Sequence, residues 1–139
     1  FTEAAFMLGE EYRPAPYSKE YVESTLRRLS CLGPSKVVLT GVAFDGRQVG
    51  SASYDRSTDE ISYALSDTVD GYFHGTGDVF ASALLGAYMN GLSLAESARI
   101  AVDYTHGCIV RTKEAGTDLR YGVDFEHGIP DLLRQTGII

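Results

Sequence analysis

The fold of this chain is indicated most clearly by residues 73–83, which read FHGTGDVFASA. Gly75 and Gly77 allow a tight turn and the close approach of a ligand to the backbone. From Val79 to Asn90 the residues are mostly apolar or small, which predicts a helix that is apolar nearly all round and lies in the interior. The first amides of a helix lack partners within it, so this turn predicts an anion site for a phosphate or a developing oxyanion.

Asp78 follows the glycine turn, where the predicted anion site meets its substrate. A carboxylate there can accept the proton of an attacking hydroxyl while the amides stabilise a transferring phosphoryl group. The alternative is that Asp78 only caps the helix, which is a favoured use of Asp. The turn is not a Walker A loop, because no Gly-Lys-Ser/Thr follows. It is not a dinucleotide fingerprint either, because Phe80 stands in the place of the third glycine.

The elements before this turn predict a helix and three strands. Ser18 can cap a helix that runs to about Leu32. The β-branched run at residues 36–40 suits a strand buried on both faces, as in a parallel sheet. Residues 47–55 and 60–66 predict a hairpin around a turn at residues 56–59.

The elements after it are mainly helical. Ser93 and Glu96 form a capping box for a helix that runs to about Ala115, with Gly116 as its stop. Residues 121–125 suggest a short strand or extended segment, and residues 129–135 a final helix. We therefore predict one α/β domain over residues 1–139, with a mostly parallel sheet, an antiparallel hairpin and flanking helices.

Composition excludes several classes of function. A net charge of −7 without a basic run argues against a nucleic-acid surface. The longest apolar stretch, residues 79–89, is too short to span a bilayer, so we expect no membrane partner and a cytoplasmic protein. Cys31 and Cys108 are expected to be buried free thiols. The Cys and His residues do not recur at the spacing of metal ligands, so we expect no structural zinc site.

The sequence from Gly75 to Asp78, followed by a helix of small and apolar residues, resembles the signature of ribokinase-superfamily kinases. The resemblance implies that Asp78 is the catalytic base and that Gly75, Thr76 and Gly77 form the anion hole. It also implies a ribokinase-like fold, of which this chain corresponds to the C-terminal half.

Two further segments match in family order. The first four residues, Phe-Thr-Glu-Ala, resemble the tail of the Pro-Asn-x-x-Glu-Ala segment of vitamin B6 kinases, which implies that Glu3 helps to organise Mg²⁺ and its waters. The segment VVLTG at residues 37–41 resembles the strand whose terminal Thr touches the ATP phosphates. Thr40 and Gly41 inherit that role. Because the matching segment begins inside a motif, we expect the chain to be a piece of something longer.

The resemblance also implies a nucleotide pocket. Phe73 and His74 would line it without taking part in the chemistry. Val102, Thr105 and Ile109 either wall the adenine, as the corresponding helix does in the family, or are plain core.

The resemblance as a whole implies ATP-dependent phosphorylation of the 5′-hydroxymethyl group of pyridoxal, pyridoxamine or pyridoxine. ATP and the vitamer would be the partners, Mg²⁺ the cofactor, with a monovalent cation left open, and a homodimer is expected. One alternative is a kinase for hydroxymethylpyrimidine or a sugar, although hydroxymethylpyrimidine kinases commonly carry Cys where this chain has Asp78. The other is a catalytically incomplete module that binds nucleotide or a protein partner.

Overall fold

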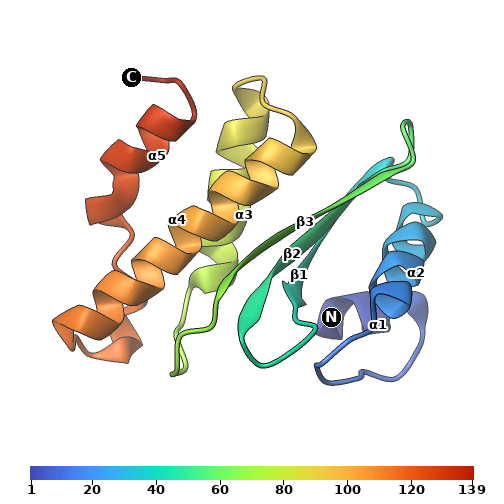
Figure 1. Ribbon diagram of the computed structural model, residues 1–139, viewed down its shortest axis with the longest axis horizontal. Coiled ribbons are helices and arrows are strands. Elements are labelled where there is room, and N and C mark those ends of the chain that lie inside the picture. Colours follow the sequence, from blue (N-terminus) through green and yellow to red (C-terminus); the bar gives the residue numbers. More distant parts are fainter. The chain divides into compact units, whose positions relative to one another are not determined.

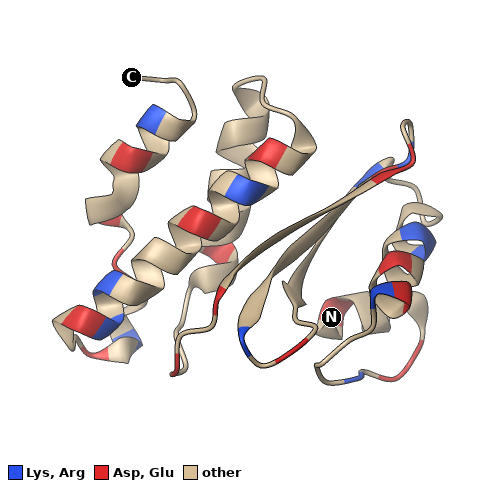
Figure 2. Ribbon diagram, in the orientation of Figure 1, with Lys and Arg blue, Asp and Glu red and all other residues tan.

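The computed structural model describes residues 1–139 and divides them into two compact units, Phe1–Thr68 and Val69–Ile139 (Figure 1). The assignment of residues 1–139 to one domain stays a prediction. Lys and Arg residues are spread over separate elements of both units, with acidic residues between them (Figure 2). None of the helices combines the length and the apolar character needed to cross a membrane.

The first unit contains two helices and a three-stranded sheet. The helices are α1 (Thr2–Leu8) and α2 (Lys19–Ser30), and the strands are β1 (Lys36–Val42), β2 (Gln48–Asp55) and β3 (Glu60–Asp67). The Ser18 hydroxyl accepts a hydrogen bond from the Tyr21 amide at 3.1 Å, which confirms the predicted start of α2. The helix ends at Ser30, two residues before the expected end.

The core of the first unit lies between α2 and the sheet. Val22 and Leu26 of α2 are fully buried together with Leu39, Val42 and Ala52 of the strands. Burial of each of the larger side chains contributes about 1.5–3 kcal/mol. The apolar stripe of α2 therefore fixes this helix on one face of the sheet. A stack of three aromatic rings, Phe1, Tyr17 and Tyr21, completes the same core.

The sheet is antiparallel throughout, in the order β1-β2-β3. The hairpin of β2 and β3 is confirmed, with Asp55 opposite Glu60 next to the turn. The prediction that residues 36–40 form a parallel strand buried on both faces is wrong for this sheet, because β1 pairs antiparallel with β2 and Val37 and Val38 are only half-buried. A short β-branched run does not reveal the direction of the neighbouring strand. Here the connection from β1 to β2 is short, and a short connection can join only antiparallel neighbours.

The second unit is helical. It contains α3 (Thr76–Met89), α4 (Leu94–Ala115), the short 3₁₀ turns η1 (Leu119–Tyr121) and η2 (Glu126–Gly128), and α5 (Ile129–Gln135). The capping box of Ser93 and Glu96 forms as predicted, and α4 ends at Gly116 in the left-handed conformation. The final helix is also confirmed.

Helices α3 and α4 pack against each other through small residues. The buried positions of α3 are Phe80, Ala83 and Ala87, and those of α4 include Ala98 and Ala101. Alanine at a helix contact lets two backbones approach closely, so this pair forms the centre of the second unit.

Three expectations differ from the structure. Helix α3 does not lie wholly in the interior, because Leu85 and Met89 are 61% and 74% exposed. Residues 121–125 contain no strand: Tyr121 ends the 3₁₀ turn η1, and residues 122–124 are irregular, so of the two predicted alternatives the strand is wrong. Cys31 is exposed because it lies just past the end of α2, where the chain meets solvent. Cys108 is buried as expected.

Candidate functional site

The start of α3 presents a row of free backbone amides. Gly75 is its N-cap, with φ 82° and ψ 1°, a left-handed conformation that favours glycine. The helix begins at Thr76, so the amide of Val79 is the first to find a partner, the Gly75 carbonyl at 3.1 Å. The amides of Thr76, Gly77 and Asp78 donate to no group of the chain. They are therefore available to an anion, at the positive end of the helix dipole.

Asp78 lies in the first turn of α3, and its side chain is exposed. It takes part in none of the ion pairs of the chain. No side-chain hydrogen bond caps α3, so the alternative that Asp78 serves as a helix cap is not what the structure shows. The carboxylate is free to accept a proton beside an anion site.

Asp78 also borders a hollow of about 390 Å³ inside the second unit. Helix α3 contributes one wall through Val79, Ser82 and Ala83, in addition to Asp78. The remaining lining residues come from α4 and the C-terminal segment: Tyr104, Phe125, Ile129 and Leu132. Apart from the carboxylate, the Ser82 hydroxyl and the tyrosine, this hollow is apolar.

The predicted nucleotide residues lie in the same unit but do not line that hollow. Phe73 is half-buried and His74 is exposed, with its ring edge-on to Tyr72. Val102 is buried, and Thr105 and Ile109 are half-buried on α4. The hydroxyl of Thr105 is buried without a hydrogen-bond partner. The spacing of these three α4 residues places them near one face of the helix, and their contact with adenine stays a prediction.

The first unit holds the other predicted residues. Glu3 and Thr40 line one groove of about 410 Å³, together with apolar residues of α1, α2 and β1. Both side chains are exposed. Gly41, next to Thr40, has φ 72° and lies where the pairing of β1 with β2 becomes irregular. The structure therefore brings residues of two segments that were separate predictions, Phe1, Glu3 and Ala4 of the first and residues 37–40 of the second, to one groove.

The fit of Mg²⁺ to these residues follows from how this ion is bound. The chain contains no group of three or more His, Cys, Asp or Glu residues that could hold a metal ion. Mg²⁺ usually keeps several waters and is held by one or two carboxylates together with substrate phosphates. A single exposed carboxylate, Glu3, in the same groove as Thr40 is compatible with this mode of binding.

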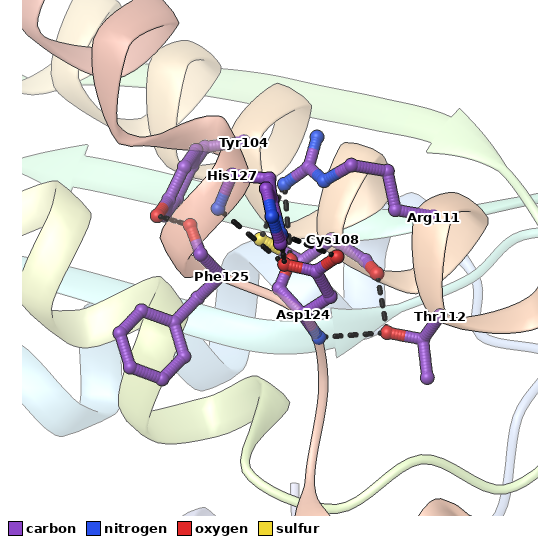
Figure 3. Close-up of polar contacts among 7 residues, drawn as sticks. All are labelled: Tyr104, Cys108, Arg111, Thr112, Asp124, Phe125 and His127. Atoms are coloured by element: carbon purple, nitrogen blue, oxygen red, sulfur yellow. Dashed lines mark hydrogen bonds and ion pairs between the residues drawn. The ribbon is translucent and has the colours of Figure 1, made fainter. Parts of the chain in front are cut away.

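A polar network on α4 was not found by sequence reasoning (Figure 3). Tyr104 donates to the Phe125 carbonyl at 2.6 Å, and Arg111 donates to the Asp124 carbonyl at 3.1 Å. The Thr112 hydroxyl donates to the Cys108 carbonyl at 2.7 Å and accepts from the Asp124 amide at 2.8 Å. These bonds attach the start of the C-terminal segment to α4.

Burial and charge shift the ionisation of this network. Burial raises the pKa of Tyr104 to about 12 and raises the pKa of the Cys108 thiol, so both stay protonated at neutral pH. The hydrogen bond from His127 lowers the pKa of Asp124, whose carboxylate lies 2.8 Å from the His127 Nδ1 atom. The Asp124 carboxylate also accepts a hydrogen bond from the His127 amide at 3.4 Å.

One signal in the sequence could have found the network. Tyr104, Cys108 and Arg111 recur at the spacing of one helix face, and Thr112 follows. A helix face that mixes hydroxyl, thiol and guanidinium groups needs polar partners when it is buried. Those partners are backbone groups more than ten residues away, which is why the residue pattern alone did not identify them.

Comparison with known proteins gives a consistent family. The sequence model of the phosphomethylpyrimidine kinase family matches residues 1–122. A putative phosphomethylpyrimidine kinase from Bacteroides thetaiotaomicron superposes with a TM-score of 0.87 at 28% identity, over 94% of this chain and 45% of that protein. A second crystal form of it, with pyridoxal, gives 0.86 at 28% identity, over 94% and 46%.

A pyridoxal kinase from Lactobacillus plantarum superposes with a TM-score of 0.82 at 26% identity, over 96% of this chain and 47% of that protein. No curated protein matches the chain. The chain thus spans slightly less than half the length of the solved proteins it matches. On the family match and these structural neighbours, the chain belongs to the phosphomethylpyrimidine kinase family, within the ribokinase-like superfamily of small-molecule kinases.

Proposed function

We propose that this chain carries the phosphate cradle and the catalytic base of an ATP-dependent kinase that phosphorylates the 5′-hydroxymethyl group of pyridoxal, pyridoxamine or pyridoxine. The observation that carries the proposal is the start of α3, where three free amides lie beside the free carboxylate of Asp78. An anion site next to a proton acceptor is the minimum that transfer of a phosphoryl group to an alcohol requires.

In this proposal Asp78 accepts the proton of the substrate hydroxyl as its oxygen attacks the γ-phosphorus of ATP. The bond between that phosphorus and the oxygen bridging to ADP breaks, and ADP leaves. The amides of Thr76, Gly77 and Asp78 stabilise the charge on the transferring group, and they do so without reorganisation because the helix already fixes them.

The first unit supports the same reaction through its groove. The Thr40 hydroxyl and the backbone at Gly41 would bind phosphate oxygens, and Glu3 would hold Mg²⁺ through its waters. When bound, Mg²⁺ neutralises charge on the phosphates. ATP as the donor and Mg²⁺ as the cofactor are general to the family and are proposals for this chain.

The choice of substrate rests on Asp78 and on the neighbours. A pyridoxal kinase is among the similar structures, and the putative phosphomethylpyrimidine kinase was crystallised in a form with pyridoxal. The second candidate is hydroxymethylpyrimidine, which the family name favours. Both acceptors present a hydroxymethyl group on a flat heteroaromatic ring, so the same base serves either one.

The test is a substrate panel with the full-length protein and its Asp78→Asn variant. We expect ATP-dependent phosphorylation of at least one B6 vitamer, with kcat/KM above that for hydroxymethylpyrimidine. Asp78→Asn should lower kcat by about 10²–10⁴-fold, the usual contribution of a positioned base. Asp70→Asn is the matched control, because Asp70 is exposed in the same unit and forms no ion pair or hydrogen bond in the chain.

Two outcomes would count against the proposal. A fall in turnover of only a few fold for Asp78→Asn, with ATP affinity unchanged, would refute the assignment of the base. Phosphorylation of hydroxymethylpyrimidine but of no B6 vitamer would replace the first substrate by the second.

A further inference from the structure

The backbone at Asp124 and Phe125 is held almost entirely by side chains of α4. Three polar groups of this backbone bond to α4 side chains: the Asp124 amide to Thr112, the Asp124 carbonyl to Arg111 and the Phe125 carbonyl to Tyr104 (Figure 3). The backbone bond that these groups also form is local: the Phe125 carbonyl accepts from the Gly128 amide at 3.1 Å in the turn η2. We call Tyr104, Arg111 and Thr112 the α4 clamp.

Close packing completes the clamp at Gly128. A Cβ atom added there would lie 2.3 Å from the Arg111 Nη2 atom and 2.8 Å from the Tyr104 ring. Arg111 also donates to the Cys108 sulfur at 3.3 Å, and Thr112 is only 1% exposed. The segment thus has little freedom to move away from α4.

From Phe125 on, the segment forms an apolar wall of the same hollow that Asp78 lines. Phe125, Ile129 and Leu132 form this wall, and Tyr104 of the clamp also lines the hollow. We propose that the α4 clamp positions this apolar wall on the hollow side of Asp78, which is otherwise exposed, so that with ATP bound the wall limits the approach of water from that side and favours transfer to the alcohol over hydrolysis of ATP. The inference rests on the proposed kinase function, and the wall residues Phe125, Ile129 and Leu132 lie beyond the family match at residues 1–122.

The physical reason is that water competes with the substrate alcohol for the same base. If water reaches Asp78, its oxygen can attack the γ-phosphorus. The bond from that phosphorus to ADP then breaks, a proton passes to Asp78, and the products are ADP and inorganic phosphate. Exclusion of water from the site suppresses this side reaction. The amides of α3 do not distinguish the two nucleophiles, so the selection falls to the surroundings of the carboxylate.

The experiment measures two rates on the full-length protein with ATP and Mg²⁺. One is the hydrolysis of ATP without an acceptor, and the other is transfer to pyridoxal. Thr112→Val removes the hydroxyl that holds the Asp124 amide but keeps the shape of the side chain, whereas Thr112→Ser keeps the hydroxyl. Tyr104→Phe removes only the bond to the Phe125 carbonyl. Tyr121→Phe is the control, because Tyr121 is 87% exposed and forms no side-chain hydrogen bond.

We expect Thr112→Val and Tyr104→Phe to raise the ratio of hydrolysis to transfer by about threefold to tenfold, in line with the loss of one hydrogen bond. Thr112→Ser should restore the wild-type ratio, and Tyr121→Phe should not change it. A parallel fall of both rates, with the ratio unchanged, would show that the clamp serves stability alone and would overturn the inference. Should Thr112→Val fail to fold, Tyr104→Phe decides by the same ratio. A wild-type protein without transfer activity would instead refute the proposed function.

Discussion

The start of α3 and the segment at residues 124–128 both bring backbone polar groups and a carboxylate together, but they use them differently. At α3 the amides of Thr76, Gly77 and Asp78 are free, and so is the Asp78 carboxylate. In the other region the amide and carbonyl of Asp124 are bonded to side chains of α4, and its carboxylate is bonded to His127.

The difference follows from burial. Polar groups that stay in contact with solvent can remain unpaired at little cost, whereas buried ones must find partners within the protein. Asp78 and its neighbouring glycines are exposed, while Thr112 and Cys108 are buried. The comparison therefore distinguishes a site that stays open to a ligand from a network that holds the chain in place. Four measurements test this distinction.

The largest contrast is expected for the two aspartates. Asp78→Asn should remove about 10²–10⁴-fold of the turnover while the free energy of unfolding changes by no more than about 0.5 kcal/mol, since the side chain has no partner to lose. Asp124→Asn should do the reverse and lower stability more than activity. Turnover and urea-induced unfolding measured on the same preparations test both. Equal losses of stability for the two variants would contradict the distinction between a functional and a structural aspartate.

The next largest effect is expected at Gly128. Gly128→Ala places a methyl group within 2.8 Å of the Tyr104 ring and closer still to Arg111. The clamp must shift to admit it, which should lower the free energy of unfolding by about 1–3 kcal/mol. Gly46→Ala is a suitable control, because nothing lies within 4 Å of a Cβ atom there and its φ is not in the left-handed region. The same unfolding temperature for both variants would show that Gly128 is not packed tightly against Tyr104 and Arg111.

A comparable effect is expected for Thr112. Thr112→Val leaves the Asp124 amide without its acceptor and should cost about 1–3 kcal/mol of unfolding free energy. Thr112→Ser should cost less, because the hydroxyl remains. Chemical denaturation of the pair gives the difference directly, and a serine variant as unstable as the valine variant would mean that the methyl group, not the hydroxyl, matters.

The smallest effect is the pH dependence of the pair formed by Asp124 and His127. The pKa of Asp124 is lowered in the folded protein, first by the hydrogen bond from His127, from a reference value of 3.8. A carboxyl with a depressed folded pKa contributes stability that is complete above its unfolded pKa and is lost as pH falls through the folded pKa. The drop in stability between pH 6 and pH 3 should therefore be smaller in His127→Gln than in the wild type. Unfolding curves at both pH values measure it, and an equal drop would show that the pair is not formed in solution.

Much of the fold was predictable because its signals are local. The caps at Ser18 and Ser93 and the stop at Gly116 involve residues within four positions of each other, and all three formed as predicted. The hairpin at residues 48–67 follows from alternating strands around a short turn. Parallel pairing for β1 was wrong because strand direction depends on which neighbour is available, and the run itself does not encode that.

The candidate site was predictable to a similar extent. The motif from Gly75 to Asp78 indicated free amides beside a carboxylate, and the structure has that arrangement. The roles of Thr40, Gly41 and Glu3, and the adenine wall on α4, stay predictions. The wall formed by Phe125 and the clamp that holds it were missed, because their partners lie more than ten residues apart in the sequence.

By itself, the sequence determined where helices begin and end, which residues form the hairpin, and which turn offers an anion site. These features depend on hydrogen bonds and backbone conformations within a few residues. Only the tertiary structure decided that β1 pairs antiparallel, that Leu85 of α3 stays exposed, and that Thr112 holds the Asp124 amide. Each of these depends on which distant groups meet when the chain packs, and burial then forces every enclosed polar group to find its partner.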